Sequence, residues 1–180
     1  MKVEKTPLKD CFLVIPDIFP DHRGIFLETF HRRNFAEKTG IDTEFVQDNQ
    51  SISSYGVLRG LHFQKGEHAQ TKLVRVIHGK VLDVVVDLRS DSSTFKQSFS
   101  AILDDQNLHQ LYIPKGFGHG FITLSEKSVF AYKCDQYYVP GSEGGIIYND
   151  PDLNIDWNFP EKDLILSEKD KNLPTLKEIF

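Results

Sequence analysis

The stretch Lys72-Leu-Val-Arg-Val-Ile-His-Gly-Lys-Val-Leu-Asp-Val-Val-Val-Asp-Leu88 decides the fold class. It is rich in β-branched residues, which favour strands over helices. We expect strands over Lys72–His78 and Lys80–Leu88, joined by a hairpin turn at Gly79. In the second strand Leu82, Val84, Val86 and Leu88 share one face, and Asp83, Val85 and Asp87 share the other. Apolar residues on both faces indicate a sheet that is packed on both sides, as in a double-sheeted barrel.

Similar short runs follow along the chain, and many are bounded by Gly, Pro, Asp or Ser, as strand ends usually are. The further expected strands cover Phe12–Ile15, Gly24–Phe30, Glu44–Ser51, Val57–Gln64, Lys96–Leu103, Gln110–Ile113, Gly120–Leu124 and Val129–Tyr138. Helix is scarce: His31–Lys38 predicts about two turns ending at Gly40, and Ser167 is placed to N-cap a short helix. The sequence therefore predicts an all-β protein, an antiparallel β-sandwich or double-sheeted barrel of jelly-roll type with a few short helices, in one domain over residues 1–180.

Composition narrows the classes of function. The chain has 180 residues, 39% hydrophobic and 26% charged, which is the ordinary globular balance. A net charge of −5 without a basic run argues against nucleic acid as a partner, although a few local Arg and Lys can hold one diphosphate. No apolar run approaches the roughly 20 residues that span a bilayer, and the N-terminus lacks the apolar stretch of a secretory signal. Cys11 and Cys134 form no spaced framework and are predicted to be buried. We expect a cytoplasmic protein that does not bind a membrane.

The first candidate site is Arg59-Gly-Leu-His-Phe-Gln64, in the middle of a predicted strand. In a regular strand Arg59 and His62 would face opposite ways. Gly60 between them is a candidate β-bulge that would re-aim one of the two side chains. Alternatively, the two residues contribute to different surfaces, for example across a dimer. Both interpretations stay open, as does a purely structural role for His62.

The second candidate site is Ile113-Pro-Lys-Gly-Phe-Gly-His-Gly-Phe121. Its Pro-x-Gly-x-x-His pattern resembles the second conserved stretch of cupin barrels, whose His often binds a metal. The first cupin stretch needs a His-x-His pair followed by Glu, whereas here His62 and His68 stand six apart. A metal site needs three or four convergent ligands, so we expect no bound metal.

The third candidate site runs from Phe130 to Pro140 and contains Tyr132 and Tyr138. Aromatic packing and a functional role, as a phenol donor or a flat surface for a base, are equally compatible with this pattern. Several other polar residues are predicted to be solvated surface: His22, His31, His109 and the pair Asp104 and Asp105.

These segments and several others resemble the dTDP-4-dehydrorhamnose 3,5-epimerase family. The matching stretches occur in the family's order and cover nearly the whole chain. They are Asp21–Glu28, Phe45–Asn49, Gly56–Gln64, Ala69–Val74, Asp83–Arg89, Ile113–Phe121, Tyr132–Tyr138, Asn149–Pro151 and Leu166–Asp170. Each stretch alone is weak evidence, but the ordered set is specific. One departure is Tyr148, where the family is expected to have Trp before Asn-Asp, and it leaves fine specificity open.

The resemblance implies a homodimer of cupin-like jelly-roll barrels without metal or nicotinamide cofactor, and a dTDP-linked 4-keto-6-deoxyhexose as substrate. By position, it implies that His62 is the general base, Asp170 its orienting partner, Tyr132 the general acid and Lys72 the stabiliser of charge on the keto oxygen. The positions that match substrate-holding residues are Arg23, Glu28, Gln47, Asn49, Arg59, His119, Tyr138, Glu143 and Lys169. The resemblance further implies that some of these serve the partner subunit's site and that Tyr138 stacks on the base.

The implied reaction inverts C3 and C5 of dTDP-4-dehydro-6-deoxy-D-glucose, giving dTDP-4-dehydro-L-rhamnose for surface polysaccharide synthesis. His suits the role of base because its unperturbed pKa is about 6.5. Four alternatives remain: an epimerase that inverts one of the two carbons, a 3,4-ketoisomerase of similar barrel shape, a metal-dependent cupin, and a barrel that binds sugar without catalysis.

Overall fold

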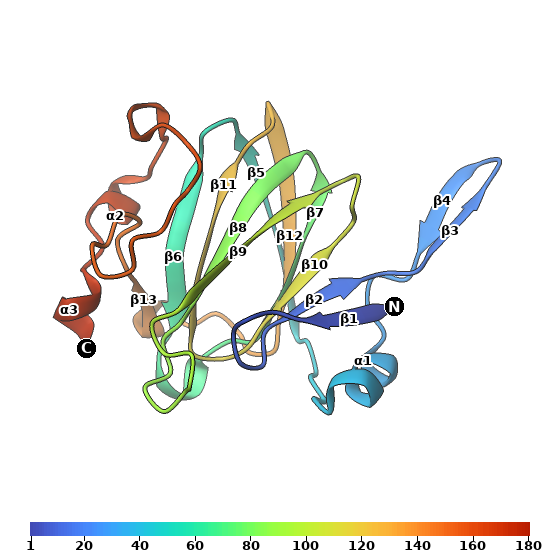
Figure 1. The fold of residues 1–180 in the computed structure, drawn as a ribbon, viewed down its shortest axis with the longest axis horizontal. Helices are drawn as coiled ribbons and strands as arrows, with labels where there is room; N and C mark the ends of the chain where they lie inside the picture. Colours follow the sequence, from blue (N-terminus) through green and yellow to red (C-terminus); the bar gives the residue numbers. More distant parts are fainter.

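The structure is a computed structural model that describes residues 1–180. Two antiparallel sheets form the body of the molecule (Figure 1). The six-stranded sheet has the order β1 (Lys2–Lys5), β2 (Phe12–Ile15), β10 (Gln110–Ile113), β7 (Lys72–His78), β12 (Lys127–Cys134) and β5 (Gln47–Ser54). The five-stranded sheet has the order β13 (Glu143–Gly145), β6 (Leu58–Gln64), β11 (Phe117–Thr123), β8 (Lys80–Asp87) and β9 (Ser98–Asp104). The predicted all-β, double-sheeted architecture is confirmed.

The main core lies between the two sheets. Val74 of β7, Val85 of β8, Phe121 of β11 and Phe130 of β12 meet there, and all four are buried. Full burial of a side chain of this size contributes about 1.5–3 kcal/mol. This shared core fixes the two sheets face to face, with the pocket-lining side chains between them.

A second core covers the outer face of the five-stranded sheet. Leu82, Val84 and Val86 of β8 pack there against Trp157 and Leu176 of the C-terminal segment. The segment includes α2 (Glu168–Lys171) and α3 (Leu176–Ile179). The strand β8 thus carries apolar residues on both faces because each face is covered, as the alternation predicted.

The prediction of a hairpin turn at Gly79 is wrong. β7 pairs with β10 and β12 in one sheet, whereas β8 pairs with β9 and β11 in the other, so the chain changes sheet at Gly79. The tight corner requires glycine, because its φ is 83° and a Cβ would lie 2.1 Å from the carbonyl oxygen of Lys127. Asp105, predicted to be solvated surface, accepts the Gly79 N–H at 2.7 Å and holds the corner.

Both predicted helix signals are confirmed. α1 (Arg32–Thr39) ends at Gly40, which has a φ of 75°. Its N-cap is His31, whose ring nitrogen accepts the Asn34 N–H at 3.3 Å, so this residue is more than solvated surface. Ser167 caps α2 by accepting the Asp170 N–H at 3.1 Å. None of the three helices is long and apolar enough to cross a membrane.

Three strands were not predicted: β1, β13 and the first strand of a hairpin made of β3 (Ile18–Asp21) and β4 (Gly24–Leu27). β1 is an edge strand with a single apolar residue among three charged ones, β13 has three residues with two glycines, and β3 contains Pro20, so each lacks an apolar alternation. The hairpin projects away from the two sheets (Figure 1). The predicted strand Gly24–Phe30 ends early, at Leu27.

Candidate active site

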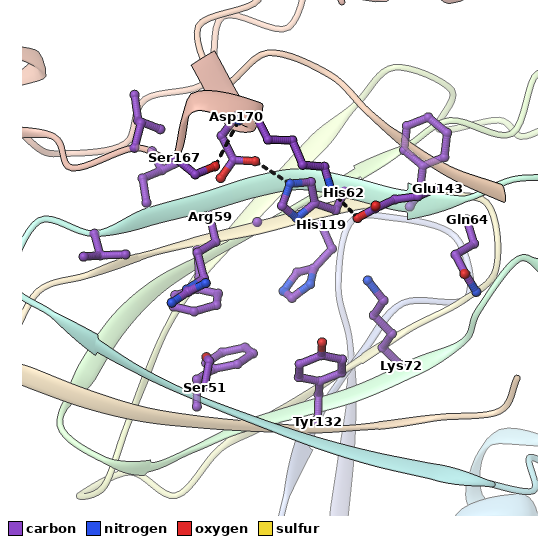
Figure 2. Close-up of a pocket in the computed structure, with 18 of the residues that line it drawn as sticks. Ser51, Arg59, His62, Gln64, Lys72, His119, Tyr132, Glu143, Ser167 and Asp170 are labelled. Atoms are coloured by element: carbon purple, nitrogen blue, oxygen red, sulfur yellow. Dashed lines mark hydrogen bonds and ion pairs between the residues drawn. The ribbon is translucent and has the colours of Figure 1, made fainter. Parts of the chain in front are cut away.

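A cavity of about 610 Å³ lies between the two sheets and is partly closed by residues 165–170. Nine of the thirteen predicted site residues line it: Arg59, His62, Lys72, His119, Tyr132, Tyr138, Glu143, Lys169 and Asp170. In Figure 2, Arg59, His62 and His119 point into the open space from one sheet, and Lys72 and Tyr132 point into it from the other. The fold therefore brings together residues that are up to 111 positions apart in the chain, from Arg59 to Asp170.

A bulge in β6 turns Arg59 and His62 toward the same cavity. His62 pairs with His119 and Arg59 pairs with Phe121, so two residues of β6 oppose the single residue Gly120 of β11. Gly60 has a φ of 122°, and a Cβ there would lie 2.5 Å from the Gly120 Cα atom. The predicted bulge is confirmed, and the alternative that the two side chains serve different surfaces is wrong.

His62 forms a partly buried pair with Asp170. Its Nε2 atom lies 2.6 Å from Asp170 Oδ1, and Asp170 is 4% exposed at the start of α2. Burial by itself would raise the pKa of Asp170, but the hydrogen bond and the nearby charge of His62 outweigh it, and the pKa lies below its usual range. An ionised Asp170 accepts the Nε2 proton and leaves the lone pair on Nδ1, which makes His62 a base.

A second His–carboxylate pair lies beside the first. His119 Nε2 is 2.8 Å from Asp83 Oδ2, and both residues are buried. The other carboxylate oxygen of Asp83 is buried without a hydrogen-bond partner. The sequence signal for Asp83 was an acidic residue on the inward face of an apolar strand, but it did not identify His119 as the partner.

Lys72 and Tyr132 face the two histidines from the six-stranded sheet (Figure 2). The Lys72 ammonium forms no ion pair and lies 5.9 Å from the centre of the Tyr132 ring. Burial lowers the pKa of Lys72 and raises the pKa of Tyr132. A cation without a carboxylate partner and a protonated phenol are thus available at one side of the cavity.

Three residues form a polar group at the mouth of the cavity. The Tyr138 hydroxyl donates to Glu143 Oε2 at 3.1 Å, and Lys169 Nζ lies 2.5 Å from Glu143 Oε1. The Tyr138 ring is 49% exposed. A flat, half-exposed aromatic ring with fixed charges beside it is suited to bind a nucleobase.

The other four predicted residues do not line the cavity. Arg23 lies at the exposed hairpin, where it pairs with Asp21 at 2.6 Å, and Glu28 follows β4. Gln47 and Asn49 lie on β5 and bond each other at 3.0 Å. Tyr148, the departure from the family pattern, also lies outside the cavity, and its hydroxyl donates to Glu161 at 2.9 Å.

No group of three or more His, Cys, Asp or Glu side chains in residues 1–180 is arranged to hold a metal ion. His68 lies 3.8 Å from Glu67 and is not among the residues that line the cavity with His62 and His119. Metal independence of the activity stays a prediction.

Comparison with known proteins agrees with this geometry. A family model described as dTDP-4-dehydrorhamnose 3,5-epimerase matches residues 5–178. The chain is 48% identical over 181 residues to the Escherichia coli dTDP-4-dehydrorhamnose 3,5-epimerase, covering 100% of this chain and 97% of the relative.

Two crystal structures match closely. The dTDP-4-dehydrorhamnose 3,5-epimerase of Elizabethkingia anophelis has 55% identity and a TM-score of 0.96, covering 99% of this chain and 97% of that chain. The dTDP-6-deoxy-D-glucose-3,5-epimerase of Legionella pneumophila, solved with dTDP-4-keto-L-rhamnose, has 46% identity and a TM-score of 0.95, covering 99% and 94%. By sequence and by structure, this chain belongs to the dTDP-4-dehydrorhamnose 3,5-epimerase family.

Proposed function

We propose that this enzyme inverts C3 and C5 of dTDP-4-dehydro-6-deoxy-D-glucose, giving dTDP-4-dehydro-L-rhamnose. The observation that carries the proposal is the placement of a base and an acid on opposite sheets. His62 lies on β6 of one sheet and Tyr132 on β12 of the other, and both line one cavity. A sugar ring between them would lose a proton from one face and gain a proton on the other, which is inversion.

His62 removes the proton from the carbon next to the C4 ketone. The electron pair of the C–H bond moves into the C–C bond, and negative charge develops on the C4 oxygen. Asp170, whose pKa is lowered, stays ionised and stabilises the imidazolium that forms on His62. Each well-positioned acid or base contributes about 10²–10⁴-fold to such a reaction.

Lys72 and Tyr132 complete the step. The Lys72 ammonium has no carboxylate partner, so its charge is free to stabilise the enolate oxygen. Tyr132, whose pKa burial raises, keeps its proton until the carbanion takes it up on the opposite face. His62 and Lys72 serve C3 and C5 in turn, since both carbons adjoin the same ketone, and no redox change occurs.

The nucleotide is proposed to lie at the mouth of the cavity. Tyr138 offers its ring to the base, while Glu143 and Lys169 flank it. Arg59 and His119 are proposed to hold the substrate deeper in the cavity, where both point inward (Figure 2).

A homodimer is proposed as the working assembly. The hairpin β3–β4 carries Phe19 and Phe26, which are 57% and 69% exposed and contact each other with ring centres 6.3 Å apart. Exposed apolar side chains on a projecting hairpin favour association with a second copy. Arg23 lies in this hairpin and Glu28 directly follows it, both outside their own subunit's cavity. We propose that this segment, the arm, reaches the partner subunit's site.

A mixing experiment tests the shared site. The variants Arg23→Ala and His62→Ala are expected to be inactive alone. If the arm serves the partner, a heterodimer regains one intact site, and random mixing restores about a quarter of wild-type activity. If Arg23 serves its own subunit, or not at all, mixing restores nothing beyond the two parent activities.

Deuterium incorporation tests the reaction itself. The protein is incubated with dTDP-4-keto-6-deoxyglucose in deuterated water, and deuterons at C3 and C5 are counted by NMR. Deuterium at both carbons with inversion is expected, with or without chelator. Deuterium at one carbon identifies a mono-epimerase, loss of turnover after chelation identifies a metal-dependent cupin, and nucleotide binding without exchange identifies a non-catalytic barrel.

A cytoplasmic location is also proposed. Cys11 and Cys134 are both buried and unpaired, which suits a reducing compartment. Fractionation of cells that express the tagged full chain would test the location.

A further inference from the structure

The loop between β12 and β13 is held by glutamine side chains. Four consecutive residues of this loop, 136–139, each have one backbone group bound by a glutamine. Gln70 Nε2 donates to the Gln136 carbonyl at 2.9 Å, and Gln47 Oε1 accepts the Tyr138 N–H at 2.9 Å. Gln64 binds twice: it donates to the Tyr137 carbonyl at 3.2 Å and accepts the Val139 N–H at 2.7 Å. The backbone on both sides of Tyr138 is thus fixed by Gln64.

Gln64 has no hydrogen-bonding capacity left for a ligand. Besides the two bonds above, its Nε2 donates to the His68 carbonyl at 2.9 Å, and its Oε1 accepts the Ser142 hydroxyl at 3.2 Å. A glutamine amide has two donor hydrogens and two acceptor lone pairs, so all four are used. The side chain is 6% exposed although it borders the cavity. Its influence on a ligand therefore acts through the loop.

Besides these glutamine bonds and the hydroxyl bond to Glu143, little packing holds Tyr138 in place. Tyr137 and Tyr138 are 66% and 49% exposed, so burial of their rings contributes little to the loop's position. Gln64, in contrast, lies on β6, which pairs on both sides in the five-stranded sheet; Gln64 comes two residues after His62 and pairs with Glu143 of β13. One rigid strand thus carries the proposed base and the clamp of the loop (Figure 2).

We propose that Gln64 is a positioning residue for nucleotide binding: it fixes the 136–139 backbone so that Tyr138 presents its ring, beside Glu143, to the base of the nucleotide. The inference rests on the proposed function, because it takes dTDP as the ligand. It assigns Gln64 no contact with the sugar and no part in proton transfer.

A double-mutant cycle with dTDP as the probe tests the inference. Gln64→Leu removes all four bonds and is expected to weaken dTDP binding about tenfold, as loss of a stacking aromatic would. The turnover number at saturating substrate should change less than about threefold, because His62, Asp170, Lys72 and Tyr132 do not lie on the loop. In a Tyr138→Ala background, Gln64→Leu should cost almost no further affinity, because it acts through Tyr138. Additive losses would overturn the inference.

Amide hydrogen exchange provides a readout without ligand. The Val139 N–H, which Gln64 accepts, should be protected in the wild type and exchange much faster in Gln64→Leu. Thr43→Val is the matched control, because it removes a buried hydrogen bond, to Tyr112 at 2.9 Å, away from the cavity. This control should leave dTDP affinity and loop protection unchanged. Equal losses in Thr43→Val would show general destabilisation and overturn the inference.

If Gln64→Leu does not fold, Gln64→Glu is carried through the same cycle, since it keeps the acceptor oxygens but cannot donate to Tyr137. A wild type that does not bind dTDP refutes the proposed function and the nucleotide role together. A wild type that binds dTDP, with unchanged affinity in the Gln64 variants, refutes the positioning role alone.

Discussion

The two walls of the cavity hold their ionisable side chains in different ways. On the wall of β6 and β11, each histidine has a buried carboxylate: Asp170 for His62 and Asp83 for His119. On the wall of β7 and β12, Lys72 and Tyr132 have no carboxylate partner, and burial shifts the pKa of Lys72 down and that of Tyr132 up.

This difference separates the chemical roles. A carboxylate fixes the tautomer of a histidine and stabilises its protonated form, so the first wall is suited to accept protons. A buried cation without a counter-ion favours a negative oxygen nearby, and a phenol with a raised pKa gives up its proton only to a strong base such as a carbanion. The second wall is therefore suited to stabilise the enolate and to reprotonate it.

The largest expected effect comes from removing the base. His62→Ala should lower turnover at C3 and at C5 by about 10³–10⁴-fold, within the range of a positioned acid–base group, while dTDP affinity changes little. Hydrogen exchange followed by NMR in deuterated water measures both carbons separately. Exchange at the wild-type rate would show that His62 is not the base. Asp83 would then be the next candidate.

Tyr132→Phe should affect the two carbons unequally. The ring and its packing remain, but the proton that the acid delivers is gone, so we expect about 10²–10³-fold less inverted C5 product. C3 should still exchange with solvent, because His62 and Lys72 are intact. Time-resolved NMR of both proteins at equal concentration distinguishes the outcomes. Wild-type yields of the doubly inverted sugar would make Tyr132 a packing residue.

The two carboxylates on the wall of β6 and β11, Asp170 and Asp83, should differ in their effect on turnover. Asp170→Asn should lower turnover about 100-fold, because it mis-sets the tautomer of the base. Asp83→Asn, which orients a residue proposed to hold the substrate, should cost about tenfold and act mainly on KM. The comparison uses steady-state kinetics on the two amide variants side by side. A larger loss of turnover in Asp83→Asn would make His119 the base.

A carboxylate outside the cavity gives the smallest effect on activity. Asp87 accepts hydrogen bonds from Arg89, Ser92 and Thr94. Burial alone would raise its pKa, but these hydrogen bonds lower it to about 2. Its folded-state pKa lies below the unfolded value, so its stabilisation is present above about pH 4 and is lost as the pH falls toward 2.

We therefore expect Asp87→Asn to lower the free energy of unfolding by about 1–2 kcal/mol at pH 7 and by less at pH 3, with turnover unchanged. Urea unfolding of both proteins at the two pH values measures the difference. An equal loss at both pH values would show that the charge of Asp87 does not contribute, and a fall in turnover would link this cluster to the site.

Local features of the sequence predicted local features of the structure. The alternation in Lys80–Leu88 predicted two covered faces, Gly60 predicted the bulge, and Gly40 and Ser167 predicted helix ends. Each of these depends on backbone conformation or on side-chain period within a few residues. The ordered motifs also sufficed to indicate the family, which the comparisons then confirmed.

Tertiary structure alone decided which strands pair and which side chains meet. Gly79 had the sequence of a hairpin turn, yet the strands on its two sides joined different sheets, because pairing is set by the core between β7, β8, β11 and β12. The sequence does not predict that Asp83 contacts His119 across neighbouring strands. Nor does it predict that Gln64 binds the backbone of a loop more than 70 positions away. The spacing of residues in a sequence does not predict contacts between residues that are far apart in the chain, since these contacts form only when non-local strands pack into one barrel.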